Sequence, residues 1–301
     1  MNTNIKKISA VILNFKGLKD TLECINSIKK QKIPPGVKLQ IIVIDNNSQD
    51  ESAGILSKVK DIEFIANKKN LGFAAGCNVA VRYALSKKSD FVLILNNDTY
   101  ADPTLLQNLL FASKKADIIC PKIYFAKGFE YHKNRYKYNE IGKVIWYAGG
   151  KIDWKNIIGK HIGVDEVDRG QFNRSCDVDF ATGAAIFVNR TVFEKVGLFD
   201  EKYFLYLEDM DFCVKAKKAG CKIMYEPKAV LWHKNAQSVQ GSGSRLQDYY
   251  ITRNRLLFAL KYASLKTKFA LIKQAFTQIN NPIRRKALFD FITFRFGEGR
   301  L

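Results

Sequence analysis

Apolar runs alternate with amphipathic segments through the first 120 residues of this 301-residue chain. Four runs have the length and aliphatic composition of buried strands: 8–13, 40–45, 62–67 and 91–95. Three segments between them carry apolar residues at helical spacing: 18–30, 48–59 and 77–85. Buried strands separated by amphipathic helices are typical of a parallel sheet covered on both faces, so the pattern predicts an α/β fold.

The pattern becomes irregular after residue 120. Residues 121–180 are rich in Tyr, Lys, Gly and Trp, and predict short strands and loops draped over the sheet. ATGAAIFVN predicts a turn and a strand, followed by a helix over 190–196. EDMDFCVKAKKAG starts with acids and ends with lysines before Gly220, the charge order of a helix closed by glycine. CKIMYEPKAVLWH predicts a further strand, residues 240–245 a flexible loop, and the remainder helices.

Short polar side chains stand at the carboxyl ends of the predicted strands. Asn14 follows the first strand, and Asp45 ends the second. Asn70 lies in the turn after the third, and Asn96-Asn97-Asp98 end the fourth. Asn and Asp are ordinary turn residues, which would explain any one of these ends alone. Because ligands of such sheets bind outside the carboxyl ends of the strands, four polar ends together predict a binding crevice. The chain has neither GxGxxG nor a P-loop pattern, which argues against a dinucleotide or P-loop site.

The composition suggests an anionic partner. Lys and Arg number 49 against 29 Asp and Glu, a formal charge of +20. Nucleic acid, an acidic membrane surface and phosphorylated substrates all fit this charge, as does a basic surface without a role. No nucleic-acid reader motif is present, which disfavours the first of these. The six cysteines form no CxxC pair or zinc spacing, and predict reduced thiols of a cytosolic protein. No run approaches the ~20 apolar residues of a membrane-spanning helix.

Asp98, with Asn96 or Asn97, is a candidate for holding a divalent cation that bridges a diphosphate. Oxygen ligands suit Mg2+ or Mn2+, which bind through one or two carboxylates and phosphate oxygens. Such a cation would stabilise the charge of a departing diphosphate. His233, at the end of VLWHK, is a candidate additional ligand and would favour Mn2+. A structural histidine is the alternative at that position.

Glu208 and Asp209 open the predicted acidic helix after the aromatic run YFLYL. A helix amino terminus stabilises a carboxylate, and a general base must be ionised. Asp209 is therefore a candidate for deprotonating an acceptor hydroxyl. The alternative is that both acids only improve the first helical turn.

Seven motifs occur in an order that resembles the family 2 glycosyltransferases, and more narrowly their rhamnosyltransferase-like branch, which builds cell-surface polysaccharides. The likeness runs from about residue 7 to residue 260, in this order: LNFKGLKDTLECINSI, VIDNNSQD, NLGFAAGCN, LILNNDT, TGAAIFVNR, GLFDEKYFLYLEDMDFCVKAKKAG and LWHK. The resemblance implies a GT-A fold, in which a Rossmann-like nucleotide-sugar half is extended by an acceptor half. It implies transfer of a sugar from a nucleoside diphosphate, with inversion and without a covalent intermediate.

The same resemblance implies roles at the strand ends. The family's Asp-x-Asp metal motif falls on Asn96-Asn97-Asp98, where asparagine replaces the first acid. The family's general base falls on Asp209, and Glu208 would orient the acceptor or the base. His233 matches a contact to the metal or the diphosphate.

The donor pocket is implied by further matches. Asp45 matches the acid that meets the nucleotide, and the same pocket would be lined by Asn14, Asn70, Gly72 and Phe73. Thr182 and Gly183 match the stretch that passes close to the donor sugar.

The predicted organisation is a GT-A domain over 1–248, divided into a nucleotide-sugar half (1–120) and an acceptor half (121–248), and a basic helical region over 249–301. The last region has eleven Lys or Arg residues against two acids, and its apolar residues recur at helical spacing. It predicts either peripheral binding to an anionic membrane or a helix packed on the domain. We therefore expect a cytoplasmic enzyme, peripheral on the plasma membrane, with Mn2+ or Mg2+, a nucleoside-diphosphate sugar and a glycan or lipid-diphosphate acceptor, and no nucleic acid. The alternative is an inactive relative that acts as a scaffold or binds polyanions.

Overall fold

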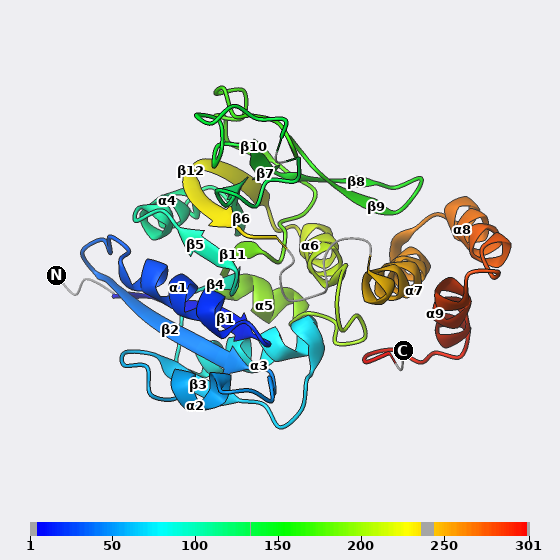
Figure 1. Cartoon of the computed structure of the whole chain (residues 1–301), viewed down its shortest axis with the longest axis horizontal. Coiled ribbons are helices and arrows are strands. Elements are labelled where there is room, and N and C mark those ends of the chain that lie inside the picture. Colours follow the sequence, from blue (N-terminus) through cyan, green and yellow to red (C-terminus); the bar gives the residue numbers. More distant parts are fainter. Residues whose placement is uncertain (1–4, 133, 236–243, 300–301) are drawn as a thin grey trace.

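Four parallel strands form the amino-terminal half of a large sheet, as the alternating pattern predicts. A computed structural model describes residues 5–132, 134–235 and 244–299 (Figure 1). The strands adjoin in the order β3-β2-β1-β4. Their bounds are β1 (Lys6–Asn14), β2 (Val37–Asp45), β3 (Glu63–Ala66) and β4 (Phe91–Asn96). The helices that connect them are α1 (Leu18–Lys29), α2 (Ser52–Leu56) and α3 (Gly72–Ser86).

The register aligns the polar strand ends at one edge. Asn14 on β1 pairs with Asp45 on β2, and Leu13 on β1 pairs with Asn96 on β4. The predicted convergence of these strand ends is confirmed.

The helices differ in length from the prediction. α3 begins at Gly72, five residues before the predicted start, because a contact from a remote segment holds its first turn. Backbone N–H groups of Phe73 and Ala74 donate to the carbonyl oxygen of Phe204. α2 is much shorter than its predicted range.

The second half of the sheet mixes strand directions, in the order β4-β11-β6-β12-β10. β11 is antiparallel to both β4 and β6, and β12 is parallel to β6. The strands are β6 (Ile118–Phe125), β10 (Cys176–Asp177), β11 (Ala185–Asn189) and β12 (Ile223–His233), with β5 (Thr99–Ala101) beside β12 and β7 (Ile145–Tyr147) beside β6. The helices of this half are α4 (Leu105–Ala112), α5 (Arg190–Val196) and α6 (Glu208–Lys218).

Residues 121–125 do not lie over the sheet as predicted but form part of its central strand β6. Pro121 and Lys122 interrupt the apolar run and conceal this strand in the sequence. Lys122 is buried because its ammonium lies 2.6 Å from both Asp168 Oδ2 and Asn173 Oδ1. The rest of the irregular region has the short strands expected, including the hairpin β8 (Gly150–Asp153) and β9 (Ile158–His161).

Three carboxyl-terminal helices form a group beside the sheet, with α6 between them and the strands (Figure 1). They are α7 (Arg245–Tyr262), α8 (Leu265–Thr277) and α9 (Pro282–Ile292). The domain boundary expected after residue 248 falls inside α7, whose buried residues Leu256 to Ala259 belong to the main hydrophobic core. Residues 240–243 of the expected loop lie outside the described residues, and Ser244 caps α7 through its side chain. No helix in the described ranges is long and apolar enough to cross a bilayer.

Candidate active site

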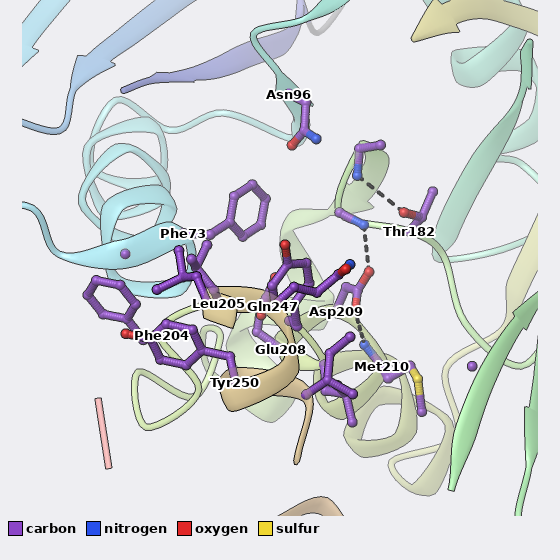
Figure 2. A pocket seen from close by; sticks show the side chains of 18 of the residues that line it. Phe73, Asn96, Thr182, Phe204, Leu205, Glu208, Asp209, Met210, Gln247 and Tyr250 are labelled. Atoms are coloured by element: carbon purple, nitrogen blue, oxygen red, sulfur yellow. Dashed lines mark hydrogen bonds between the residues drawn. The ribbon is translucent and has the colours of Figure 1, made fainter. Parts of the chain in front are cut away.

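A cavity of about 680 Å³ opens at the carboxyl ends of the parallel strands. Its walls come from the ends of β4 and β12, the start of α3, the turn before β11, the start of α6, the hairpin β8–β9 and α7. Eleven of the residues expected from the sequence line it: Asn70, Gly72, Phe73, Asn96, Asn97, Asp98, Thr182, Gly183, Glu208, Asp209 and His233. Figure 2 shows Asn96 across the pocket from Phe204 and Tyr250, with Asp209 to one side, near Glu208 and Met210.

Asn14 and Asp45 are buried behind this wall and do not line the cavity. Nδ2 of Asn14 donates to Oδ1 of Asp45 at 2.7 Å and to Oγ of Ser48 at 3.0 Å. Asp45 also accepts hydrogen bonds from the backbone N–H and the hydroxyl of Ser48. In this structure the pair joins the ends of β1 and β2 and shapes the loop that follows, and their predicted nucleotide contacts stay a prediction.

Asn46 lines the cavity and organises the turn before α3. Its Nδ2 donates to Oδ1 of Asn70 at 2.8 Å and to the carbonyl of Gly72 at 3.1 Å. Its Oδ1 accepts from Nδ2 of Asn67 and from the backbone N–H of Leu71. The sequence gives no sign of this role for Asn46, because its partners lie in another segment.

Glycine is required at position 72 because the chain approaches itself there. Gly72 has a φ of +75°, and a Cβ on it would lie 2.5 Å from the carbonyl oxygen of Phe204. This close contact brings the start of α3 against the segment that precedes Glu208 and Asp209.

That segment has strained backbone. Phe204, Tyr206 and Leu207 have φ values of 62°, 68° and 71°. Residues other than glycine rarely adopt this left-handed backbone conformation. Each such residue costs about 1–3 kcal/mol and persists only where surrounding contacts hold it. The strained turn runs directly into Glu208 and Asp209, so it decides where the two carboxylates lie.

Two residues of α7 supply those contacts. Nδ2 of Asn254 lies 2.8 Å from the carbonyl oxygen of Tyr203 and 2.6 Å from that of Leu205. Arg253 is fully buried, and its guanidinium donates to the carbonyls of Tyr203 and Gly297. The α7 helix therefore supports the turn that precedes Glu208 and Asp209, a role that the sequence did not indicate.

Asp209 and Glu208 lie in different electrostatic surroundings. Burial raises the pKa of Asp209, while the backbone N–H groups of Gly183 and Met210 donate to its two oxygens and oppose that shift. Burial, and then the charge of Asp209, raise the pKa of Glu208 well above its ordinary range. Oε2 of Glu208 is buried without a hydrogen-bond partner among the described residues. Burial thus outweighs the helix amino terminus, which was expected to favour an ionised Asp209, and Asp209 is the acid that ionises first.

Asp98 and His233 meet at the end of β4 and β12. Nε2 of His233 lies 3.0 Å from Oδ1 of Asp98, and both side chains are buried. Neither ring nitrogen of His233 has a partner of hydrogen-bond geometry in the described part of the chain. Asn97 instead directs its amide to Thr21 Oγ1 on α1 at 3.0 Å. No cluster of three or more His, Cys, Asp or Glu within the described residues forms a cation site, so Asp98 and His233 offer two ligands at most.

An aromatic wall that the sequence did not identify borders His233. The Trp146 ring meets the rings of His233 and His161 edge to face, at centroid distances of 4.4 and 4.6 Å. Burial lowers the pKa of His161 to about 4, so this ring is neutral at pH 7. Trp146 and His161 come from the irregular region 121–180, where no periodic pattern in the sequence indicates them.

The sheet topology and the cavity at its strand ends define a GT-A glycosyltransferase fold. Residues 9–197 match the model of Glycosyl transferase family 2, and the chain belongs to this family. Solved structures agree on the fold. Staphylococcus aureus TarS 1–349 in complex with UDP superposes with a TM-score of 0.58 at 17% identity, over 95% of this chain and 80% of that chain. The mannosyltransferase PcManGT from Pyrobaculum calidifontis, in complex with GDP-Man and Mn2+, has a TM-score of 0.54 at 16% identity over 98% and 76%.

Curated relatives include rhamnosyltransferases and a hexosyltransferase of glycan biosynthesis. The low-salt glycan biosynthesis hexosyltransferase Agl10 of Haloferax volcanii is 25% identical over 85% of this chain and 76% of its own length. The dTDP-rhamnosyl transferase RfbF of Shigella flexneri is 24% identical over 87% and 81%. The N-acetylglucosaminyl-diphospho-decaprenol L-rhamnosyltransferase of Mycobacterium tuberculosis is 24% identical over 66% and 68%.

Proposed function

We propose that this family 2 enzyme is an inverting hexosyltransferase of cell-surface polysaccharide synthesis. It would move rhamnose or another hexose from a nucleoside diphosphate to a glycan or lipid-linked acceptor. The observation that carries the proposal is Asp209, which lines the cavity and is held by two backbone N–H groups. The Asn96–Asp98 strand end lines the same cavity from another element. The base and the group that stabilises the leaving diphosphate would therefore occupy separate parts of the cavity.

In the reaction, Asp209 accepts the proton of the acceptor hydroxyl. The acceptor oxygen forms its bond to the anomeric carbon from one side, while the bond to the diphosphate breaks on the other. A raised pKa suits this base, because proton transfer is most effective when the pKa of the base approaches the working pH. The raised pKa of Glu208 favours its protonated form, which would leave the negative charge on Asp209.

A divalent cation fits the residues at the other end. The Asp98 carboxylate and the imidazole of His233 are buried together and suit Mn2+ or Mg2+. Such a cation supplies a Lewis acid for the charge of the leaving diphosphate. With two protein ligands, the donor's phosphate oxygens and water would complete its coordination. The names of Agl10 and the rhamnosyltransferases support the hexosyl donor and the glycan role.

The α8–α9 surface supports a peripheral membrane location. At about 100° per residue, four exposed apolar side chains of α8 fall within an arc of about 60°: Leu265, Phe269, Ile272 and Phe276. Lysines flank this stripe, and α8 has no acid. α9 adds Phe289 and Ile292, and Phe294 follows two residues after the helix; all three are exposed.

An anionic bilayer fits this surface better than a second copy of the chain. Residues 264–295 have seven Lys or Arg and one acid, and that acid, Asp290, is buried. Two such surfaces would repel each other, whereas each Lys or Arg near an anionic leaflet contributes about 1 kcal/mol of attraction. We therefore place the enzyme on the cytoplasmic face of the plasma membrane, where a lipid-linked acceptor would be reached.

The test is nucleoside diphosphate release from a panel of donors: dTDP-rhamnose, UDP-hexoses, UDP-N-acetylhexosamines and GDP-mannose, each with Mn2+ or EDTA. Selective release from one donor is the expected result, and Asp209→Asn is the matched inactive control. Release from no donor, together with no thermal stabilisation by any nucleotide, would contradict the proposal and favour the scaffold alternative.

A further inference from the structure

The cavity contains very little fixed positive charge for a protein with 49 Lys and Arg residues. Arg255 of α7 is the one Lys or Arg among the described residues that line it. The other charged groups on the wall are carboxylates: Asp98, Glu208, Asp209 and Glu298. A single arginine in a cavity expected to receive phosphate groups is a candidate for a specific anion contact.

Arg255 joins α7 to the turn of the β8–β9 hairpin. Its Nε donates to the carbonyl oxygen of Asn156 at 2.7 Å, which fixes the plane of the guanidinium. The two terminal nitrogens have no protein partner in the ranges that the structure describes. Burial lowers the pKa of Arg255, and the charge of Asp153 opposes that shift. The terminal nitrogens are thus held in place and available to a ligand.

A structural ion pair does not account for this arginine. Asp153, on the hairpin, lies 3.3 Å from the ammonium of Lys160 and accepts hydrogen bonds from Asn156. Its charge is already compensated, so Asp153 does not require Arg255.

Exposed apolar side chains surround the arginine on both sides of the cleft. Ile158 of the hairpin and Ile251, one turn before Arg255 on α7, are exposed and line the cavity with it. Trp154 of the hairpin turn is also exposed and packs on Phe258 of α7, with ring centroids 6.0 Å apart. A cation bordered by exposed apolar groups suits a ligand that has a phosphate next to an apolar chain.

The contacts of Arg255 separate it from the expected donor site. Its hydrogen-bond partner, Asn156, lies in the turn of the hairpin, whereas Asp98 contacts His233 and Lys234 at the end of β12. Donor and acceptor phosphates would therefore be bound by different elements.

We propose that the cleft between α7 and the β8–β9 hairpin is the acceptor-phosphate subsite of this enzyme. Arg255 binds the phosphate of an isoprenyl-diphosphate-linked acceptor through its two terminal nitrogens, and Ile158 and Ile251 contact the first apolar units of the lipid. The inference rests on the proposed function and adds to it the chemical class and location of the acceptor.

The test is equilibrium dialysis of the full-length protein against radiolabelled farnesyl diphosphate below its micelle concentration. Arg255→Gln should weaken binding by about tenfold or more, since the arginine makes charge-assisted hydrogen bonds. The affinity of Arg255→Lys should lie between those of the wild type and Arg255→Gln, because lysine keeps the charge but not the paired donors of a guanidinium. Arg285→Gln, which removes an exposed arginine from α9, is the matched control and should bind like the wild type.

Nucleoside diphosphate binding is measured on the same proteins, both as a check of folding and to separate the two phosphate sites. If Arg255→Gln does not fold, Ile251→Asp replaces it, because a carboxylate at this exposed rim position should repel the phosphate. Unchanged farnesyl diphosphate binding in these variants, or a loss confined to nucleoside diphosphate, would overturn the inference. A wild-type protein that cleaves a nucleotide sugar but does not bind farnesyl diphosphate would also overturn it while leaving the proposed function intact.

Discussion

The backbone N–H of Gly183 donates a 2.8 Å hydrogen bond to Oδ2 of Asp209. It joins the turn before β11 to the first turn of α6 across the cavity wall (Figure 2). Since it stabilises the charged form of a carboxylate whose pKa burial raises, it keeps Asp209 able to ionise. If Asp209 is the general base, as proposed, the same contact fixes the direction in which its carboxylate would accept a proton.

We expect Asp209→Asn to reduce transfer by about 10²–10⁴-fold, the usual contribution of a general base. Asparagine retains the hydrogen bond from Gly183 but cannot accept the acceptor's proton. Steady-state kinetics should show a loss in kcat, while calorimetry shows unchanged nucleotide binding. Undiminished transfer would exclude Asp209 as the base. Phe111→Ser, on the exposed face of α4, is a control that should leave both measurements unchanged.

The pKa of Asp209 and Glu208 predicts opposite effects of pH on stability and activity. Both pKa values are raised on folding, so the folded state binds more protons than the unfolded chain. The free energy of unfolding is therefore highest, as far as these two groups are concerned, below their unfolded pKa values of about 4. It decreases as the pH rises through their folded pKa values. Transfer should increase over that upper range as Asp209 ionises.

The measurement is the melting temperature of the wild type and of Glu208→Gln from pH 4 to pH 9, beside the pH dependence of kcat/KM. The melting temperature of Glu208→Gln relative to the wild type should increase with pH, because the glutamine side chain cannot ionise. A melting temperature difference that does not change with pH would contradict the raised pKa of Glu208.

Asn254→Ala should release the strained turn before the catalytic acids. It leaves the buried carbonyls of Tyr203 and Leu205 without a donor, at a cost of about 1–3 kcal/mol for such a group. We expect a lower free energy of unfolding and a larger loss in kcat than in KM. Denaturant unfolding and kinetics measure both effects. A variant of normal kcat would show that the turn keeps its conformation without α7. Asn108→Ala, on α4 outside the cavity, is the matched control.

Mn2+ binding should depend on Asp98 and His233. Asp98→Asn removes the one carboxylate at the strand end, so electron paramagnetic resonance should show weaker Mn2+ binding in the presence of a nucleoside diphosphate. Asp50→Asn, in the loop before α2, should bind like the wild type. Equal Mn2+ binding by both variants would exclude Asp98 as a ligand.

The α8–α9 surface should bind anionic vesicles. In sedimentation with phosphatidylglycerol vesicles, the triple variant Leu265→Ser, Phe269→Ser, Phe276→Ser should show a smaller bound fraction. It lacks the exposed apolar area that would enter the bilayer. Phe111→Ser removes a similarly exposed aromatic elsewhere and should bind normally. Raising the salt concentration should weaken wild-type binding by screening the lysines. Equal sedimentation of the triple variant would contradict a membrane role for this surface.

The strongest signals in the sequence were local. The apolar runs of β1, β2 and β4 and the charge order of α6 are short-range patterns, and these elements were predicted almost to their bounds. β6 escaped detection because its Lys122 is stabilised by Asp168 and Asn173, partners more than 40 residues away. The shortened α2 and the early start of α3 likewise follow from contacts that no local window contains.

The sequence by itself determined the α/β class, the parallel strands and the polar residues at their ends, because hydrophobic periodicity and strand direction suffice to place them on one edge. Only the tertiary structure decided which of those residues line the cavity and which, like Asn14 and Asp45, are buried behind it. It also decided that burial raises the pKa of Glu208 and Asp209, that α7 supports the turn before them, and that Arg255 reaches the same cavity. Burial and long-range hydrogen bonds depend on residues distant in the chain, so they exist only once the chain has folded.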